Sequence, residues 1–247
     1  MKKNQIVAPL AALAIVICGI SARLAYADND YIVYSPCVVQ GQSEVEIYGF
    51  DSVDGRSNLN AASGYNISAA HAFTSWWKTE MYVGQLNRDP GGSTHPSGYE
   101  FENTFQLTTP GEYWADAGFI ASYAYNKQPG LANSIEFGPL LEKLSGHVDQ
   151  RLNLIWKRPI GGDGGSNEFR SAYSISYRLD YNKATLSPGM EVYYRPADHA
   201  NQLGPVLYGE LRTDAGNELE YSIGTVFGIN QGAPNQTLLA RIDYEFF

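Results

Sequence analysis

Charged side chains recur at alternate positions along many short segments of this chain, and they are the residues best suited to act on a solute. The first half of the chain supplies carboxylates and the second half supplies arginines. The candidates are Glu44, Glu80, Glu100, Glu102, Arg151, Arg170, Arg178, Arg195 and Arg212. If the two groups face each other across an aqueous space, they create a transverse field that selects polar solutes by charge and dipole.

Enzymatic chemistry has weaker support in the sequence. The four histidines stand outside any G-x-S-x-G or H-E-x-x-H context, and they are His71, His95, His147 and His199. Nucleophilic catalysis needs a base within hydrogen-bond reach of the nucleophile, and an isolated loop histidine is usually only solvated. Glu100 and Glu102 are two positions apart, so on a strand they are more simply wall-lining than an acid–base pair. We predict no catalytic residue, no cofactor and no metal.

The start of the chain has the composition of a secretory signal peptide. Lys2 and Lys3 precede an apolar run from Ile6 to Ile20, and Ala25-Tyr26-Ala27 forms a small-x-small cleavage site. We therefore predict that residues 1–27 are removed after Ala27. Cys18 is lost with this segment and Cys37 remains alone, which excludes an internal disulfide.

The charge of the exported chain limits its partners. The formal net charge is −9, and three basic but no acidic residues lie in the first 27 positions, so the exported part is more acidic still. A nucleic-acid partner is not expected, because phosphate binding requires a basic face. No later apolar run approaches the roughly 18 residues of a membrane helix. A soluble exported β-sandwich and an outer-membrane β-barrel remain as architectures.

Period-two alternation dominates the exported part and predicts an all-β fold. In one clear case Tyr173, Ile175 and Tyr177 share a face, and Ser174 and Ser176 share the other. The expected strands are 42–54, 63–73, 76–87, 98–108, 112–126, 133–143, 147–158, 168–180, 186–195, 204–213, 217–230 and 236–247. Pro139 removes a ladder donor and predicts a bulge or a shorter strand there.

The connections between the expected strands alternate between long and short. The long ones are rich in Gly, Pro and Asn and fall at 55–62, 88–97, 127–132, 159–167, 196–203 and 231–235. The short ones fall at 74–75, 109–111, 144–146, 181–185 and 214–216. This sorting predicts a transmembrane antiparallel up-and-down β-barrel with one rim of loops and one rim of turns. Twelve strands are expected, with ten or fourteen as alternatives, and an even number places both barrel ends at the turn rim.

The last expected strand strengthens the membrane interpretation. Ile242, Tyr244 and Phe246 alternate with Arg241, Asp243 and Glu245, and the chain ends on Phe247. This end resembles the C-terminal signature of Gram-negative outer-membrane β-barrel proteins of the porin-like type. The resemblance implies a location in the bacterial outer membrane, contact with its lipid and assembly by the barrel-assembly machinery. The barrel would cover residues 42–247, and residues 28–41 would be a periplasmic segment, an extra strand or a short plug.

In a closed barrel the order of strands along the chain is their order around the lumen. The early glutamates would then form one wall and the later arginines the facing wall. We expect an outer-membrane channel or transporter that passes small polar or aromatic solutes between these walls. Two alternatives stay open: a filled structural barrel that binds an unknown periplasmic partner, and an outer-membrane hydrolase of the phospholipase type.

Overall fold

The computed structural model describes residues 31–161, 165–213 and 216–247, so the predicted signal peptide and its cleavage site lie outside the described residues. The described part has no helix long and apolar enough to cross a membrane. Its strands are β1 (Ser43–Val53), β2 (Ser63–Thr74), β3 (Trp77–Tyr82), β4 (Leu86–Arg88), β5 (Thr94–Pro96), β6 (Gly98–Gln106), β7 (Asp116–Asn126), β8 (Asn133–Ser145), β9 (Val148–Ile160), β10 (Glu168–Tyr177), β11 (Leu179–Tyr181), β12 (Ala184–Tyr194), β13 (Gln202–Arg212), β14 (Glu218–Gly228) and β15 (Gln236–Phe246).

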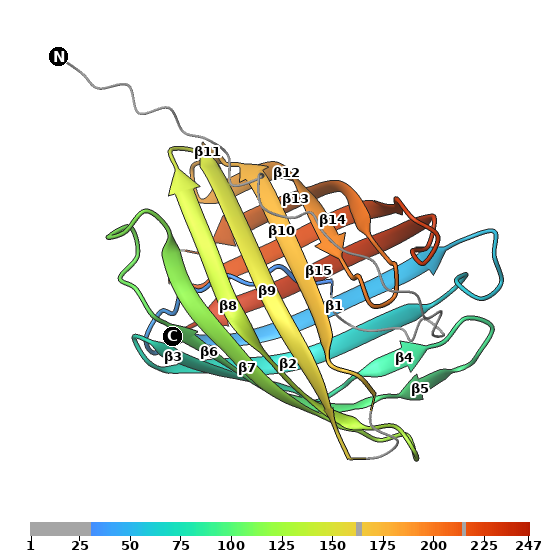
Figure 1. Ribbon diagram of the computed structural model, residues 1–247. Helices are drawn as coiled ribbons and strands as arrows, with labels where there is room; N and C mark the ends of the chain where they lie inside the picture. Colours follow the sequence, from blue (N-terminus) through green and yellow to red (C-terminus); the bar gives the residue numbers. More distant parts are fainter. Residues whose placement is uncertain (1–30, 162–164, 214–215) are drawn as a thin grey trace.

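Twelve of these strands close into an antiparallel barrel, which confirms the predicted fold class and strand number. The ring runs β1, β2, β3, β6, β7, β8, β9, β10, β12, β13, β14 and β15, and β1 pairs with both β2 and β15 to close it. Figure 1 shows the strands inclined to the barrel axis. The remaining short strands extend this ring, because β4 and β5 form a hairpin beside β2 and β11 pairs with β12.

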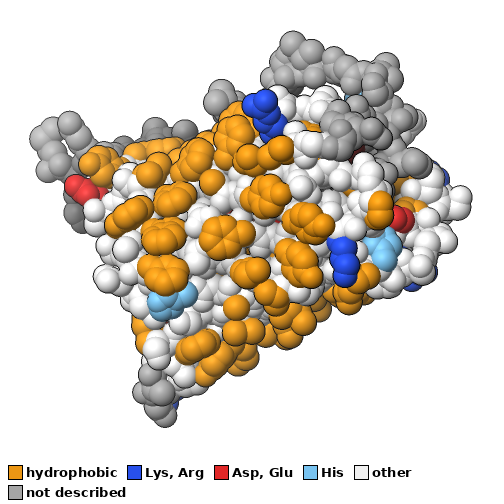
Figure 2. Space-filling view, turned by 90° about the horizontal axis from the view of Figure 1, so that it is seen from below, with side chains coloured by type: hydrophobic (Ala, Val, Ile, Leu, Met, Phe, Trp, Pro, Cys, Tyr) orange, Lys and Arg blue, Asp and Glu red, His pale blue; other side chains and the backbone are white. Residues whose placement is uncertain are grey.

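The side chains alternate between an apolar outer face and a polar inner face. On β1, Val45 and Ile47 are exposed, whereas Glu44, Glu46 and Tyr48 between them are buried. Figure 2 shows hydrophobic side chains spread over one outer face of the barrel, with few charged ones among them. A soluble protein shows the opposite polarity, whereas a barrel in a bilayer must turn its apolar face to the lipid. The alternation in the sequence thus matches the two faces of each strand.

The connections are sorted between two rims, as the sequence predicts. The loop rim contains the connections 54–62, 83–97, 127–132, 161–167, 195–201 and 229–235, and the turn rim contains 75–76, 107–115, 146–147, 178–183 and 213–217. The connection 107–115 is longer than expected because β7 begins only at Asp116. The β4–β5 hairpin was not expected from the sequence, since its strands have three residues each and show no alternation long enough to detect.

The structure corrects the expectation for Pro139. Strand β8 is neither shortened nor bulged there: Pro139 pairs in register with Phe119 of β7. On the β9 side the ladder skips residues 138–139 and resumes in the same register. A Cβ on Gly138 would lie 1.8 Å from the carbonyl oxygen of Leu154, so glycine allows β9 to approach at this point. The amide hydrogen that Pro139 lacks therefore leaves only a local gap in the ladder between β8 and β9.

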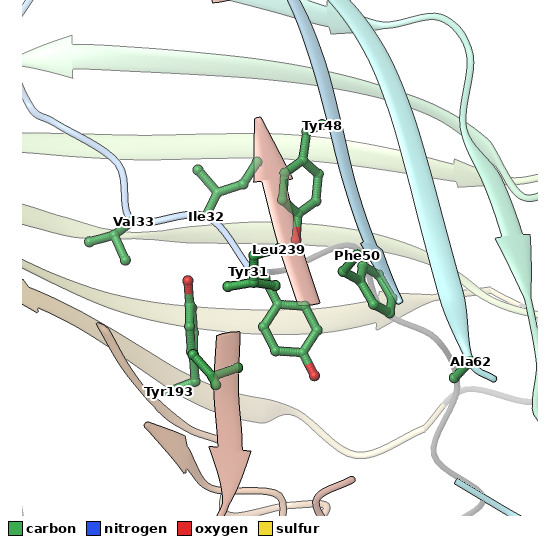
Figure 3. Close-up of a cluster of buried hydrophobic side chains, with 9 residues drawn as sticks. Tyr31, Ile32, Val33, Tyr48, Phe50, Ala62, Tyr193 and Leu239 are labelled. Carbon is green, nitrogen blue, oxygen red and sulfur yellow. The ribbon is translucent and has the colours of Figure 1, made fainter. Parts of the chain in front are cut away.

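Residues 31–41, named the plug segment from here on, form no strand; residues 31–38 lie inside the barrel, and residues 39–41 are exposed at the turn rim. The described residues of this segment do not form the expected extra strand. Tyr31, Ile32 and Val33 pack against inward side chains of β1, β12, β14 and β15, and Figure 3 shows them beside Tyr48, Phe50, Tyr193 and Leu239. The strand residues of this cluster include Tyr48, Phe50, Tyr193, Val226 and Leu239, which lie in the half of the barrel near the loop rim. The described chain thus starts in the loop-rim half, although β1 begins and β15 ends at the turn rim.

The exposed apolar face predicts that an arginine placed on it destabilises the barrel more at the middle of the bilayer than at its edge. Ile47 is 56% exposed in the middle of β1, and Val53 is 50% exposed on the same face where β1 reaches the loop rim. Ile47→Arg is expected to lower the free energy of unfolding in lipid vesicles by about 2–4 kcal/mol, and Val53→Arg by about 0–1 kcal/mol. Urea unfolding of vesicle-inserted protein measures both values. Equal losses for the two variants would contradict a bilayer around the middle of β1.

Candidate functional site

The plug segment runs along the lumen from the loop-rim half to the turn rim. At its start the Tyr31 hydroxyl donates to Oε1 of Gln202, with 2.7 Å between the oxygens. Further along, the Val38 amide donates to Oε1 of Gln106 over 2.7 Å, and the Gly41 amide donates to the carbonyl of Ala72 over 2.9 Å. Gln202 begins β13 at the loop rim, whereas Gln106 ends β6 at the turn rim. The segment therefore occupies most of the length of the lumen.

A single asparagine holds the middle of the plug segment. The amide of Tyr34 donates to Oδ1 of Asn153 over 2.7 Å, and Nδ2 of Asn153 donates to the carbonyl of Tyr34 over 2.9 Å. Asn153 is fully buried on β9, so its amide replaces the two backbone bonds that a neighbouring strand would give. A buried backbone needs such partners, because unpaired polar groups are costly.

Three further contacts fix the plug segment against the walls. Ser35 donates a hydrogen bond to Glu142 of β8. Pro36 is fully buried and lies against Gly118 of β7, where a Cβ would come within 2.7 Å of the proline ring. At the loop-rim end the guanidinium of Arg195 lies 4.4 Å from the centre of the Tyr31 ring, a cation–π contact. The plug segment is thus packed on several sides.

The predicted acidic residues lie together on neighbouring strands. Glu44 is on β1, Glu80 on β3, and Glu100 and Glu102 on β6, which are consecutive around the ring apart from β2. Each has a partner: Glu44 pairs with Nζ of Lys78 over 2.9 Å, Glu80 accepts from Ser68, Glu100 accepts from Ser122 over 2.6 Å, and Glu102 is hydrogen-bonded to Tyr34 of the plug segment. These four glutamates are the acidic wall.

The predicted basic residues lie on the opposite side of the ring, where β9 is six strands from β1. Arg151 on β9 pairs with Glu142 and Asp149, and Arg170 on β10 pairs with Glu136 over 2.6 Å. The other three lie nearer the rims. Arg195 follows β12 at the loop rim, Arg212 ends β13 beside Glu210 and Glu218, and Arg178 follows β10 at the turn rim beside Asp180. These five arginines are the basic wall, and their contact with a solute stays a prediction.

The interior also contains charged residues outside the predicted set. Arg241 on β15 pairs with Glu46 of β1 and with Asp243, and Glu191 of β12 accepts from the hydroxyls of Tyr193 and Tyr208 over 2.6 Å each. The alternation of the last strand already put Arg241 and Asp243 on the inner face, so a signal for them existed. The plug segment had no comparable signal, since its side chains show no period.

One group of carboxylates could offer oxygen ligands to a metal. Glu210, Glu218 and Glu220 each place a carboxylate oxygen within 4.8 Å of the others near the turn rim. Arg212 already forms ion pairs with Glu210 and Glu218. A side-chain cation therefore balances part of this charge.

A serine and a histidine meet on the outer face near the turn rim. Oγ of Ser43 lies 2.9 Å from Nδ1 of His71, and among the described residues this is the one polar contact of that ring. The sequence did not predict this pair. A hydrolytic pair also needs a third group that orients the histidine, as in catalytic triads. Ser43 and His71 would therefore supply a nucleophile and a base, and no described side chain contacts His71 as the third, orienting group.

Two connections at the loop rim are tied by an ion pair. Arg56 binds Asp54 through two guanidinium nitrogens and donates to the carbonyl of Ala233, while the Asn235 amide donates to Asp54 over 2.7 Å. The side-chain hydrogen bonds from Arg56 hold the pKa of Asp54 well below its ordinary value. The loops 54–62 and 229–235 are thereby joined above the seam between β1 and β15.

Comparison with known proteins adds little beyond the fold. No protein-family model matches the chain, and no curated protein matches its sequence. A bacterial polysaccharide outer membrane secretin is 11% identical, with 84% of this chain and 99% of that chain covered and a TM-score of 0.36. An anion-selective porin from Comamonas acidovorans is 7% identical, with 83% and 97% covered and a TM-score of 0.29. OccK11 (OpdR) from Pseudomonas aeruginosa is 10% identical, with 87% and 99% covered and a TM-score of 0.25. Such low scores leave the function to be argued from the lumen itself.

The two hydrogen bonds from Asn153 to Tyr34 predict that the accessibility of Cys37 depends on Asn153. Asn153→Ala removes two buried hydrogen bonds, which together contribute about 1–3 kcal/mol. We expect an impermeant maleimide to label Cys37 about tenfold faster in this variant, because local opening becomes more frequent. Asn217→Ala, which removes a bond to Tyr244 at the turn rim, is the matched control. Unchanged labelling in Asn153→Ala would show that Asn153 does not hold the segment.

The Asp54 tie predicts a pH dependence confined to acid conditions. A depressed pKa in the folded state stabilises the protein fully above the unfolded value of about 3.9, and the effect is lost as the pH falls through the folded value. The protection of the Asn235 amide, relative to its intrinsic exchange rate, should stay constant from about pH 7 to pH 5 and fall below about pH 4. In Asp54→Asn it should be low throughout. A fall in the wild type already near neutral pH would contradict this assignment.

Proposed function

We propose that this protein is a gated channel of the bacterial outer membrane for small polar or aromatic solutes. In this proposal the plug segment closes the lumen in the structure described above, and its withdrawal opens a path between the acidic wall and the basic wall. The loop rim faces the medium and the turn rim faces the periplasm, as the terminal aromatic residues and the lengths of the connections favour.

The carrying observation is the way in which the plug segment is attached. Its polar contacts with the barrel run mainly through side chains of the wall, those of Gln202 at the loop rim, Asn153 in the middle, and Glu142 and Gln106 near the turn rim. The ladder of the barrel is complete without it, since each of the twelve strands pairs with two neighbours. Withdrawal would therefore break these side-chain contacts and the apolar packing of Tyr31, Ile32 and Val33, and it would leave the backbone bonds of the barrel intact.

The lining favours polar solutes. Beneath the plug segment the inner face carries buried carboxylates, amides and hydroxyls, with Tyr48, Tyr193 and Tyr208 as aromatic surfaces. Facing walls of opposite charge would orient dipolar solutes, and tyrosine rings would stack on aromatic ones. The structural alternative keeps the same contacts but assigns them to stability alone.

Deletion of part of the plug segment distinguishes a gated channel from a structural barrel. A variant lacking residues 31–37 should show a larger single-channel conductance in planar bilayers than the full chain, because the lumen loses its occupant. In this variant Glu100→Gln with Glu102→Gln should shift the reversal potential in a salt gradient toward anions. The shift should shrink at high salt, where the Debye length falls from about 10 Å at 0.1 M to about 3 Å at 1 M.

The matched control is Glu112→Gln with Asp51→Asn, which neutralises one exposed carboxylate in the connection 107–115 and one on the outer face of β1. This control should leave the reversal potential closer to that of the parent variant. Conductance that stays at zero after deletion, in protein shown to be folded and inserted, would overturn the channel and favour the structural barrel. Conductance without any effect of the Glu100 and Glu102 substitutions would remove the acidic wall from the selectivity mechanism.

A further inference from the structure

Three basic side chains lie on the outer surface of the barrel close to the loop rim. Arg88 ends β4, Lys127 directly follows β7, and Arg158 lies two residues before the end of β9. All three are exposed, and none belongs to either charged wall of the lumen. These three residues are named the basic arc from here on.

The ladders fix the direction of Arg88 and Lys127. Arg88 lies two positions after Leu86, which is exposed and paired with an outward residue of β2, so both side chains share the outer face. Lys127 lies two positions after the exposed Tyr125, and its amide donates to the carbonyl of Ser97 over 2.8 Å. This bond extends the β6–β7 ladder by one step, so the alternation reaches Lys127. Both side chains therefore point away from the lumen.

Arg158 has the same orientation and lies within an apolar surface. It is directly opposite Ile135 of β8 and stands between Trp156 and Ile160 on its own strand. These three neighbours are exposed on the outer face. A cation on such a surface is costly within the hydrocarbon, so its long side chain must extend toward the lipid headgroups at the loop rim.

The basic arc differs from the cations inside the barrel in its partners. Lys78, Arg151 and Arg241 each form an ion pair with a carboxylate in the lumen. Within the described part of the chain no member of the arc forms an ion pair, and Nε of Arg88 donates to the carbonyl of Gly92 over 3.3 Å. The arc thus presents positive charge to whatever lies against the outer surface near the loop rim.

The spacing of the basic arc indicates the size of its ligand. Strand β8 separates β7 from β9, and the chain of β5 and β6 separates β4 from β7. Neighbouring strands lie about 4.8 Å apart, so the arc spans about 20 Å around the barrel. Two carboxylates border its Arg88 end, Asp51 on β1 and Asp89, which lies 3.3 Å from His95. A single phosphate cannot contact the whole arc, whereas a headgroup with separate phosphates can.

We propose that the basic arc binds a membrane lipid whose headgroup carries two or more phosphates, in the leaflet at the loop rim. Guanidinium and ammonium groups form strong charge-assisted hydrogen bonds with phosphate oxygens. The ligand is a lipid and not a soluble anion, because the exposed rings of Tyr125 and Trp156 lie on the same apolar face and suit acyl chains. The proposal rests on the proposed orientation, with the loop rim toward the medium, and is independent of plug withdrawal.

Native mass spectrometry of the folded mature chain in a zwitterionic detergent tests this site. The probes are diphosphoryl lipid A, with a phosphate at each end of a disaccharide, and phosphatidylglycerol, with a single phosphate. We expect diphosphoryl lipid A to bind about tenfold more tightly, because a second charge-assisted contact forms. Lys127→Gln with Arg158→Gln should weaken its binding by about 25-fold, since each cation beside an anionic lipid contributes about fivefold.

The matched control is Lys143→Gln with Lys183→Gln, which removes two positive charges near the turn rim and should bind like the wild type. Lys127→Gln alone lies outside the strands, and it replaces the double variant if that variant fails to fold. Binding to the arc variant as tight as to the wild type, or equal binding of the two lipids to the wild type, would overturn the proposal. The measurement involves no conductance, so failure of the lipid site and failure of the channel are distinguished.

Discussion

The structure depends on one constraint, the pairing of backbone polar groups in a medium that offers none. In hydrocarbon each unpaired amide or carbonyl costs several kcal/mol, so strands can cross only as a closed sheet. The pairing of β1 with β15 along its full length closes the sheet, from Ser43 opposite Phe246 to Val53 opposite Gln236. Once the sheet is closed, every strand has one face toward lipid and one toward the lumen, and the alternation of side chains follows.

The closed sheet also explains why the charges lie where they do. The inner faces cannot be left apolar and empty, and carboxylates turned inward need partners in a confined space. Arg241 pairs with Glu46 on the neighbouring strand and with Asp243 on its own strand, and Lys78 of β3 reaches across β2 to Glu44 of β1. The separation of acidic and basic walls therefore coexists with local ion pairs. An electric field across the lumen then arises from the charge that these local ion pairs do not neutralise.

The plug segment uses the same rule without forming a strand. Its backbone obtains partners from the side chains of Asn153 and Gln106. Its apolar residues cover Phe50, Tyr193 and Leu239, which would otherwise line an aqueous space. The plug segment therefore packs against the interior side chains of the barrel, but its backbone does not join the hydrogen-bond ladder between the strands. The plug segment can therefore fill the lumen although the backbone pairing of the barrel strands does not depend on it.

The sequence by itself determined the barrel and the faces of its strands, whereas the tertiary structure decided what fills the lumen. Period-two alternation is a local property, so the faces of Ile47 and Glu46 could be assigned from neighbours along the chain. The order of the strands along the chain placed Glu44 and Arg151 on opposite walls, because in a closed up-and-down barrel that order is also the order around the lumen. The position of residues 31–41 depends on contacts with Asn153, Gln202 and Glu142, more than 100 residues away, and no local pattern records them. The ion pair of Arg241 with Glu46 likewise needs the closure that brings the two ends of the chain together.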